Sequence, residues 1–146
     1  MNIYTRTQDF DLLKYLDDQQ AEELLQLSIT KPFPAYEYAL RYAEPVNSII
    51  MVQQGELEML DVTGKCVGIV QAGEIAGEEC YPDTAKACYA LRTRRDSIIR
   101  FWDFTALEGF VADKPELASR INAAINDCLC LKIIRITHMG ESNAQA

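Results

Sequence analysis

Apolar residues recur with a helical period near both ends of this chain and with the period of a β-strand in its middle. This change of period divides the chain into three parts. Leucines recur at helical intervals between about residues 8 and 30, with a break at Asp17-Asp18, and this spacing predicts two short N-terminal helices. Either Asp9 or Asp11 is the expected N-cap of the first helix. The prolines of Lys31-Pro32-Phe33-Pro34 end the helical part, because proline cannot continue a helix.

The middle of the chain, from about residue 33 to 102, has the pattern of short strands. Apolar, β-branched and aromatic residues occur in short runs, with a period of two at Tyr36, Tyr38 and Leu40. Glycines gather between residues 55 and 77, where they permit tight turns. The expected strands lie near residues 35–40, 48–52, 57–62, 66–70, 87–91 and 97–101. Short strands with regular glycine turns indicate a barrel or a rolled sandwich.

Helical spacing returns after Trp102. Asp103 is a good N-cap for a short helix to about Ala112, and Pro115 suits the first turn of a long helix that ends near residue 139. Apolar residues at heptad spacing form a seam on the long helix, which comprises Leu117, Ile121, Ala124, Cys128 and Leu131. A helix this apolar must be covered, on one side by the roll of the same domain and on the other by a second subunit, and we expect the seam to be the interface of a homodimer. The polar residues 140–146 are expected to be a disordered tail.

Charge and composition narrow the possible functions. The chain has 14 Lys and Arg against 22 Asp and Glu, a net charge of −8, which argues against nucleic-acid binding as its main task. Its one histidine, His138, excludes a metal site built from several histidines and leaves little basis for histidine-dependent catalysis. We therefore expect neither a metal site nor enzymatic activity.

The cysteines and the apolar runs indicate where the protein works. The five cysteines are odd in number and have no two-residue gap between them, so we expect reduced thiols rather than a disulfide framework. The N-terminus has no apolar stretch typical of a signal peptide, and no run approaches the roughly 18 apolar residues of a membrane span. The sequence predicts one soluble, cytoplasmic domain over residues 1–146.

The order of helices, glycine-rich roll, short helix and long apolar helix resembles the cyclic nucleotide-binding domain family. The resemblance covers roughly residues 8 to 138, and the segments that carry it are Phe33-Pro34-Ala35-Tyr36-Glu37, residues 47–58, Gly73-Glu74-Ile75-Ala76, residues 96–104 and Pro115-Glu116-Leu117-Ala118. It implies a mainly β fold with flanking helices, a double-stranded β-helix of jelly-roll type. It also implies a regulatory function through a cyclic nucleotide such as cAMP or cGMP. Catabolite activator protein-like regulators continue into a helix-turn-helix, for which no residues remain here, so direct DNA binding is not expected.

The resemblance also implies where a ligand would bind. The residues that match the start of the family's phosphate-binding cassette are Gly73, Glu74, Ile75 and Ala76. In that cassette backbone N–H groups face the phosphate, and the glutamate accepts a hydrogen bond from the ribose hydroxyl. Further expected ligand contacts are Lys86, Ala87 and Cys88, together with Lys132 on the long helix.

The cassette departs from the family pattern at its charges. Ala85 stands where the family places an arginine that pairs with the phosphate, and Lys86 follows one position later. Lysine cannot reproduce the bidentate contact of arginine, and a shift of one residue turns a strand side chain to the other face. Nearby acids, which would oppose an anion, are Glu78, Glu79 and Asp83.

The sequence therefore supports two alternative functions. In the first, the domain senses a small molecule inside the roll and transmits the signal through the long helix. In the second, it is a descendant of the fold that binds no nucleotide and serves as a dimerisation or docking module for an unidentified protein. A cluster of arginines is either a solvated ladder or a docking patch, and comprises Arg92, Arg94, Arg95 and Arg100.

Overall fold

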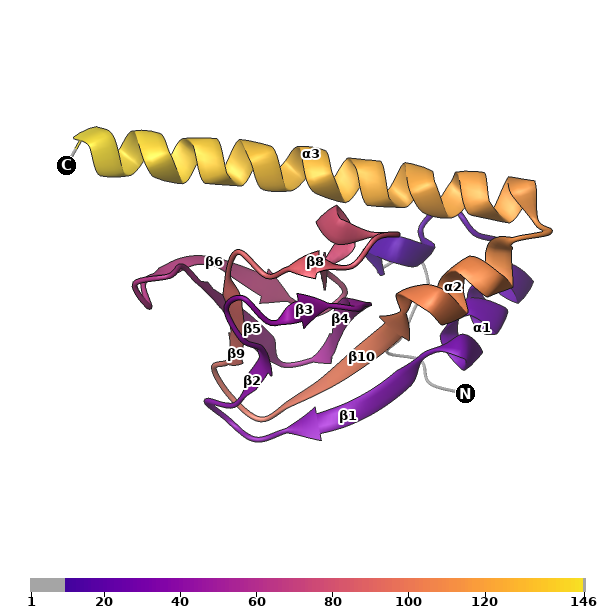
Figure 1. The fold of residues 1–146 in the computed structure, drawn as a ribbon, viewed down its shortest axis with the longest axis horizontal. Helices are drawn as coiled ribbons and strands as arrows, with labels where there is room; N and C mark the ends of the chain where they lie inside the picture. The colour runs from indigo at the N-terminus through magenta and orange to yellow at the C-terminus, as the bar shows by residue number, and fades with distance from the viewer. Residues whose placement is uncertain (1–9, 146) are drawn as a thin grey trace.

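The computed structural model describes residues 10–145, with side chains up to Cys130. Short helical segments precede a β-roll, and two helices follow it (Figure 1). The helical elements are η2 (Asp11–Leu13), α1 (Asp18–Leu27), η3 (Glu78–Cys80), α2 (Phe104–Val111) and α3 (Pro115–Gln145). The strands are β1 (Ile29–Phe33), β2 (Tyr38–Leu40), β3 (Pro45–Val46), β4 (Ser48–Gln54), β5 (Glu56–Leu60), β6 (Cys66–Gln71), β7 (Ile75–Ala76), β8 (Ala85–Lys86), β9 (Ala90–Thr93) and β10 (Ser97–Asp103).

The strands form two four-stranded antiparallel sheets and a short two-stranded ladder. One sheet has the order β1-β10-β4-β7 and the other β2-β9-β5-β6, while β3 pairs with β8. Apart from the β5–β6 hairpin, neighbours in each sheet are not consecutive in sequence, as expected of a rolled jelly-roll topology. The predicted mainly β fold with flanking helices is therefore confirmed.

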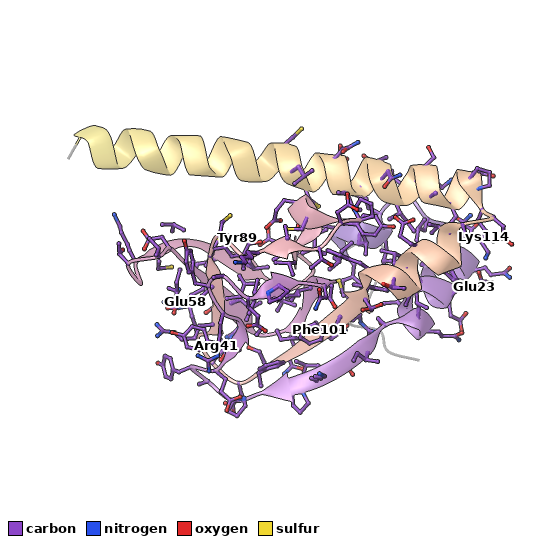
Figure 2. All side chains as sticks on the ribbon, viewed as in Figure 1. Glu23, Arg41, Glu58, Tyr89, Phe101 and Lys114 are labelled. Carbon is purple, nitrogen blue, oxygen red and sulfur yellow. The ribbon has the colours of Figure 1, made fainter. Side chains whose placement is uncertain are left out.

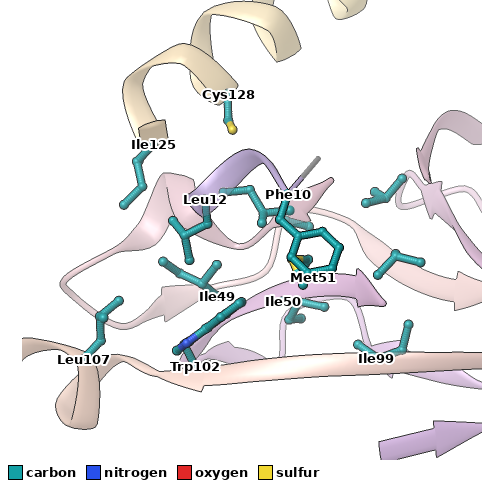
Figure 3. Close-up of a cluster of buried hydrophobic side chains, with 14 of the residues drawn as sticks. Phe10, Leu12, Ile49, Ile50, Met51, Ile99, Trp102, Leu107, Ile125 and Cys128 are labelled. Carbon is teal, nitrogen blue, oxygen red and sulfur yellow. The ribbon is translucent and has the colours of Figure 1, made fainter. Parts of the chain in front are cut away.

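The core lies between the sheets and the helices, around the pairing of β10 with β4. Trp102 is fully buried opposite Ile49, and its Nε1 donates a hydrogen bond to the Leu24 carbonyl at 2.7 Å. This bond satisfies the one polar atom of the indole and ties α1 to the sheet. Figure 3 shows Trp102 and Ile49 stacked beneath Leu12, with Ile125 and Cys128 of α3 above them.

The N-terminal residues form two helical segments that separate at Asp17-Asp18, as predicted. The N-cap predicted for the first helix is not confirmed. Asp17 is the N-cap of α1: its carboxylate accepts from Gln20 N at 2.8 Å, and the Gln20 side chain accepts from Asp17 N at 3.2 Å. Asp11 lies inside η2 instead, and Asp9 lies outside the described residues. A capping box needs both side chains at the right spacing, and Asp17 has Gln20 three residues on.

The first strand begins earlier than expected. β1 spans Ile29–Phe33, so Lys31 and Pro32 belong to the sheet rather than to a linker before residue 33. β1 is an edge strand that pairs only with β10. An edge strand tolerates proline, because one side of its ladder needs no N–H donor.

The C-terminal helices start where the sequence predicts and end later. The Asp103 side chain accepts from Ala106 N at 2.9 Å and caps α2, and Pro115 is the first residue of α3. α3 continues to Gln145, so residues 140–145 are helical rather than a disordered tail, and Ala146 lies outside the described residues. Gly140 disfavours a helix but does not break it, and no proline follows it.

The heptad seam of α3 belongs to the core of this chain. Four of its side chains are 0–5% exposed against the chain's own helices and strands: Leu117, Ile121, Ala124 and Cys128. The expectation that they form a homodimer interface is therefore wrong for these four residues. An apolar stripe shows that a helix face is covered but not what covers it. Leu131, the fifth seam residue, lies in α3, but its side chain is outside the described residues.

Across residues 10–145 we find no helix whose length and hydropathy would let it cross a membrane.

The buried seam can be tested with one substitution on each face of α3. Ile121→Asp places a charge in the core and is expected to lower the free energy of unfolding by about 3 kcal/mol or more. Ala123→Asp introduces the same side chain on the exposed face and is expected to change it by at most about 0.5 kcal/mol. Urea unfolding measures both. Equal effects of the two substitutions would show that the seam is not buried in the monomer.

Candidate functional site

A glycine turn leads into a short helix at Gly77, not at Gly73. β7 ends at Ala76, and the next residue, Gly77, has φ +84° and is the N-cap of η3 (Glu78–Cys80). A Cβ at Gly77 would lie 2.7 Å from the Ser48 carbonyl oxygen, so only glycine fits this position. A glycine turn that enters a short helix is the geometry predicted for a phosphate site. It is therefore found at Gly77-Glu78, four residues after Gly73-Glu74.

The predicted cassette residues have structural roles instead. Gly73 N donates to Val52 O at 2.8 Å, and the Glu74 carboxylate accepts from Gln71 N at 2.8 Å, which closes the turn between β6 and β7. Ile75 and Ala76 are buried in the pairing of β7 with β4. The structure does not bring these residues together as a ligand site.

The remaining predicted contacts are also dispersed. Lys86 pairs with Pro45 across β8 and β3, with an exposed side chain, and Cys88 is exposed as well. Ala87, between them, is buried. Lys132 lies in α3, but its side chain is outside the described residues.

The Tyr89 hydroxyl forms hydrogen bonds at the glycine turn. The Gly77 N–H donates to the Tyr89 hydroxyl oxygen at 3.3 Å, and the Tyr89 hydroxyl donates to the Glu79 carboxylate. Burial raises the pKa of Tyr89, and the negative charges of Glu79 and Glu78 raise it further, so the hydroxyl stays protonated. Figure 2 shows Tyr89 on the side of the roll that faces α3. A backbone N–H that a phosphate cradle would offer to an anion is thus engaged by the chain itself.

The surroundings of the turn are acidic. Glu78, the first residue of η3, is 1% exposed, and Glu79 and Asp83 follow within five residues. Between Gly77 and Ala85 the sequence has no lysine or arginine. A bound phosphate would therefore meet negative charge where the family resemblance implies a cation.

A pocket of about 440 Å³ lies beside this turn, beneath α3. Its lining comes from η3 and the residues after it, from α2 and from α3: Glu78, Glu79, Tyr81, Pro82, Glu108, Val111, Ala118, Ile121, Asn122, Ile125, Asn126 and Leu129. Tyr81 packs edge-on against Phe104, with ring centroids 5.3 Å apart. Burial raises the pKa of the Tyr81 hydroxyl, and so does its hydrogen bond to the Glu108 carboxylate.

The arginine cluster does not form a free docking patch. Arg92 and Arg94 both pair with Glu58, at 2.8 and 3.5 Å, at the end of the roll opposite α1 and α2 (Figure 2). Arg100 donates to Ser28 Oγ at 2.6 Å and to the Leu25 carbonyl at 3.2 Å, and so holds the end of α1. These three arginines contact other parts of the fold, although Arg94 is exposed, as is Arg95.

Among the side chains that the structure describes, residues 10–130, no group of three or more His, Cys, Asp or Glu is placed to hold a metal ion.

None of the residues that line the pocket was predicted from the sequence to contact a ligand. The sequence does contain a signal for the turn at Gly77, because the dipeptide Gly-Glu occurs at residues 73–74 and again at 77–78. The second pair follows the two-residue strand β7, which is too short to recognise from its composition.

Comparison with solved structures defines the fold. The chain superposes on a cyclic nucleotide-binding domain from Methylobacillus flagellatus with a TM-score of 0.78 and 15% identity, covering 86% of this chain and 78% of that one. It matches the N-terminal domain of a transcriptional regulator from Streptomyces coelicolor with a TM-score of 0.75 and 16% identity, over 88% and 95% of the two chains. It also matches the regulatory subunit of a cAMP-independent protein kinase A from Trypanosoma brucei, with a TM-score of 0.65, 15% identity, and coverage of 83% and 40%.

The fold of this chain is therefore that of the cyclic nucleotide-binding domains, as the resemblance implies. Neither the protein-family models nor the sequences of curated proteins give a match.

The close approach at Gly77 gives a test with a matched control. Gly64 also has a positive φ, +87°, but no atom lies within 4 Å of an added Cβ, so Gly64→Ala is expected to cost only the strain of the backbone, about 1 kcal/mol. Gly77→Ala adds the clash with Ser48 O and is expected to cost at least about 2 kcal/mol. Thermal unfolding measures both. A cost at Gly77 no larger than at Gly64 would contradict the tight turn.

Proposed function

We propose that this chain is a non-catalytic regulatory domain that senses a small molecule in the pocket beneath α3 and passes the signal on through α3. The proposal rests on the lining of the pocket. Six residues of α3, from Ala118 to Leu129, line it together with residues of η3 and α2. A molecule in the pocket would contact α3 and the roll together. Its binding would therefore favour one position of the helix over another.

The contacts that hold α3 outside the pocket fit this role. The Asp127 carboxylate accepts from Lys14 Nζ at 2.9 Å and from the Tyr15 hydroxyl, and these hydrogen bonds lower the pKa of Asp127. Arg120 donates to the Gln20 side chain at 2.8 Å. Lys14 and Asp127 are partly exposed, and exposed ion pairs contribute little to stability. These exposed contacts therefore add little to the cost of shifting α3, and its buried apolar face sets most of that cost.

The ligand we propose is not held by a phosphate at the glycine turn. The Gly77 N–H is engaged by Tyr89, the turn carries Glu78 and Glu79, and the stretch from Gly77 to Ala85 lacks a basic residue. Cyclic AMP and cyclic GMP are accordingly not the expected ligands. The likeness to a regulatory subunit described as cAMP-independent supports a role of this fold without cAMP.

The output surface in this proposal is the C-terminal part of α3. Beyond Cys130 the helix continues to Gln145 and extends past η3 (Figure 1). A second copy of the chain or another protein would bind there and respond to the position of the helix. We propose a homodimer through this part rather than through the buried seam. The proposed site of action remains the cytoplasm, without direct contact to DNA.

A docking module that senses no ligand is the second candidate. The observation that favours it is the closed glycine turn, in which Tyr89 takes the place of an anion. In that case α3 would bind its partner constitutively, and the state of the pocket would not matter.

Filling the pocket with a side chain separates the two candidates. Ala118 lines the pocket, so Ala118→Phe is expected to mimic a ligand and change amide hydrogen exchange along α3 at least about fivefold. Ala123→Phe, on the exposed face of the same helix, is the control and should leave the exchange unchanged. Thermal unfolding verifies that both variants fold. Unchanged exchange along α3 in a folded Ala118→Phe variant would favour the docking module.

A titration with cyclic AMP and cyclic GMP tests the ligand class. We expect no saturable shift of the thermal midpoint, whereas a ligand at 100 times its Kd would add about 2.7 kcal/mol of stability. A saturable shift with either nucleotide would contradict our interpretation of the Gly77 turn.

A further inference from the structure

We infer that the pocket beneath α3 binds a small organic cation with an apolar body, such as an aromatic or aliphatic amine. The inference rests on the proposed function, because it names the ligand class of the same pocket. It follows from three features of the lining: its charge, the groups that orient that charge, and the apolar wall opposite.

The charge of the lining is negative on one side. Glu78 and Glu79 come from η3 and Glu108 from α2, and the other lining residues are neutral, with no Lys, Arg or His among them. Glu78 is 1% exposed, whereas Glu79 and Glu108 are exposed at the rim. A concave site lined by charges of one sign and by apolar walls focuses their field, so the pocket attracts a cation and repels a carboxylate or a phosphate.

Two tyrosines orient the rim carboxylates. The Tyr89 hydroxyl donates to Glu79, and the Tyr81 hydroxyl is hydrogen-bonded to Glu108. The pKa of each tyrosine is raised, chiefly by burial, so both hydroxyls remain donors in the physiological range. A carboxylate that accepts one hydrogen bond keeps further acceptor positions on its two oxygens. The remaining lone pairs of the two carboxylates can therefore accept hydrogen bonds from an ammonium group.

The opposite wall is apolar and belongs mainly to α3. Ile121, Ile125 and Leu129 recur along one face of the helix, and Val111 of α2 continues this surface. Asn122 and Asn126, one turn apart, add amide groups at the edge. A ligand that spans the pocket would place its cationic end toward η3 and α2 and its apolar body against α3.

The size of the pocket suits such a molecule. Its volume of about 440 Å³ lies within the range of small-molecule sites, roughly 300–1,000 Å³. The described carboxylates are not grouped closely enough to coordinate a metal ion. An organic cation satisfies both the charge and the shape of the lining.

Three indole compounds whose short side chains end in a cationic, a neutral or an anionic group test the inference. Tryptamine is a cation at neutral pH, tryptophol is neutral and indole-3-acetate is an anion. By calorimetric titration of the whole chain we expect tryptamine to bind at millimolar affinity or better and at least about tenfold more tightly than tryptophol. Indole-3-acetate is expected not to bind. Equal or tighter binding of tryptophol or indole-3-acetate, or no saturable binding of tryptamine, would overturn the inference.

A matched pair of variants locates the binding. Glu108→Gln removes one rim charge and is expected to weaken tryptamine binding at least about fivefold, with little change for tryptophol. Glu22→Gln removes the same charge from the exposed surface of α1, away from the pocket, and is expected to leave tryptamine binding unchanged. An equal loss in both variants would assign the preference to net charge and overturn the site.

The inference and the proposed function fail in different ways. Charge-selective binding of tryptamine without any change in the hydrogen exchange of α3 would support the cation site and overturn signalling through the helix. An exchange response to Ala118→Phe together with binding that ignores ligand charge would overturn the cation site and keep the proposed function.

Discussion

The structure depends on the burial of one face of α3 against the chain's own roll. Leu117, Ile121, Ala124 and Cys128 close the core over η2 and the sheets. This packing fixes the direction of the helix and makes it a wall of the pocket beside η3. The same packing leaves the helix beyond Cys130 to extend past η3 toward solvent or a partner. Any event in the pocket therefore acts on the element that also carries the output surface.

In the function we propose, the glycine turn keeps its backbone geometry but does not hold a phosphate. Gly77 retains the positive φ and the close approach to Ser48 that such a turn requires. Tyr89 engages its N–H group, and Glu78 and Glu79 of η3 place acidic side chains beside the turn. The roll itself is held by β10, β4 and Trp102 rather than by this turn. Ligand chemistry and fold stability are thus carried by different residues.

Much of the fold could be predicted from the sequence because local chemistry specifies it. Asp103 and Pro115 mark the starts of α2 and α3, and the runs near residues 48–52 and 97–101 become β4 and β10. Strands of two residues, such as β3, β7 and β8, escape prediction because they exist only through their partners. Pro32 was predicted only to end the helical part, because its place at the edge of a sheet depends on tertiary pairing.

The candidate site was less predictable than the fold. Two Gly-Glu pairs stand four residues apart, and only the course of the chain through β7 shows that the second enters the short helix. Tyr89 meets Gly77 across 12 positions of sequence, a contact that no local pattern reveals. The heptad seam was recognised correctly as a buried face, but periodicity cannot distinguish a core from an interface.

The most direct test of a cation site in place of a nucleotide cradle is a map of amide chemical shifts in the ¹⁵N-labelled protein. Tryptamine is predicted to shift the amides of Glu78, Glu79 and Glu108 and those from Ala118 to Leu129, while cyclic AMP leaves Gly77 unchanged. Shifts from Gly77 to Lys86 with cyclic AMP, without a response of α3 to tryptamine, would contradict the account.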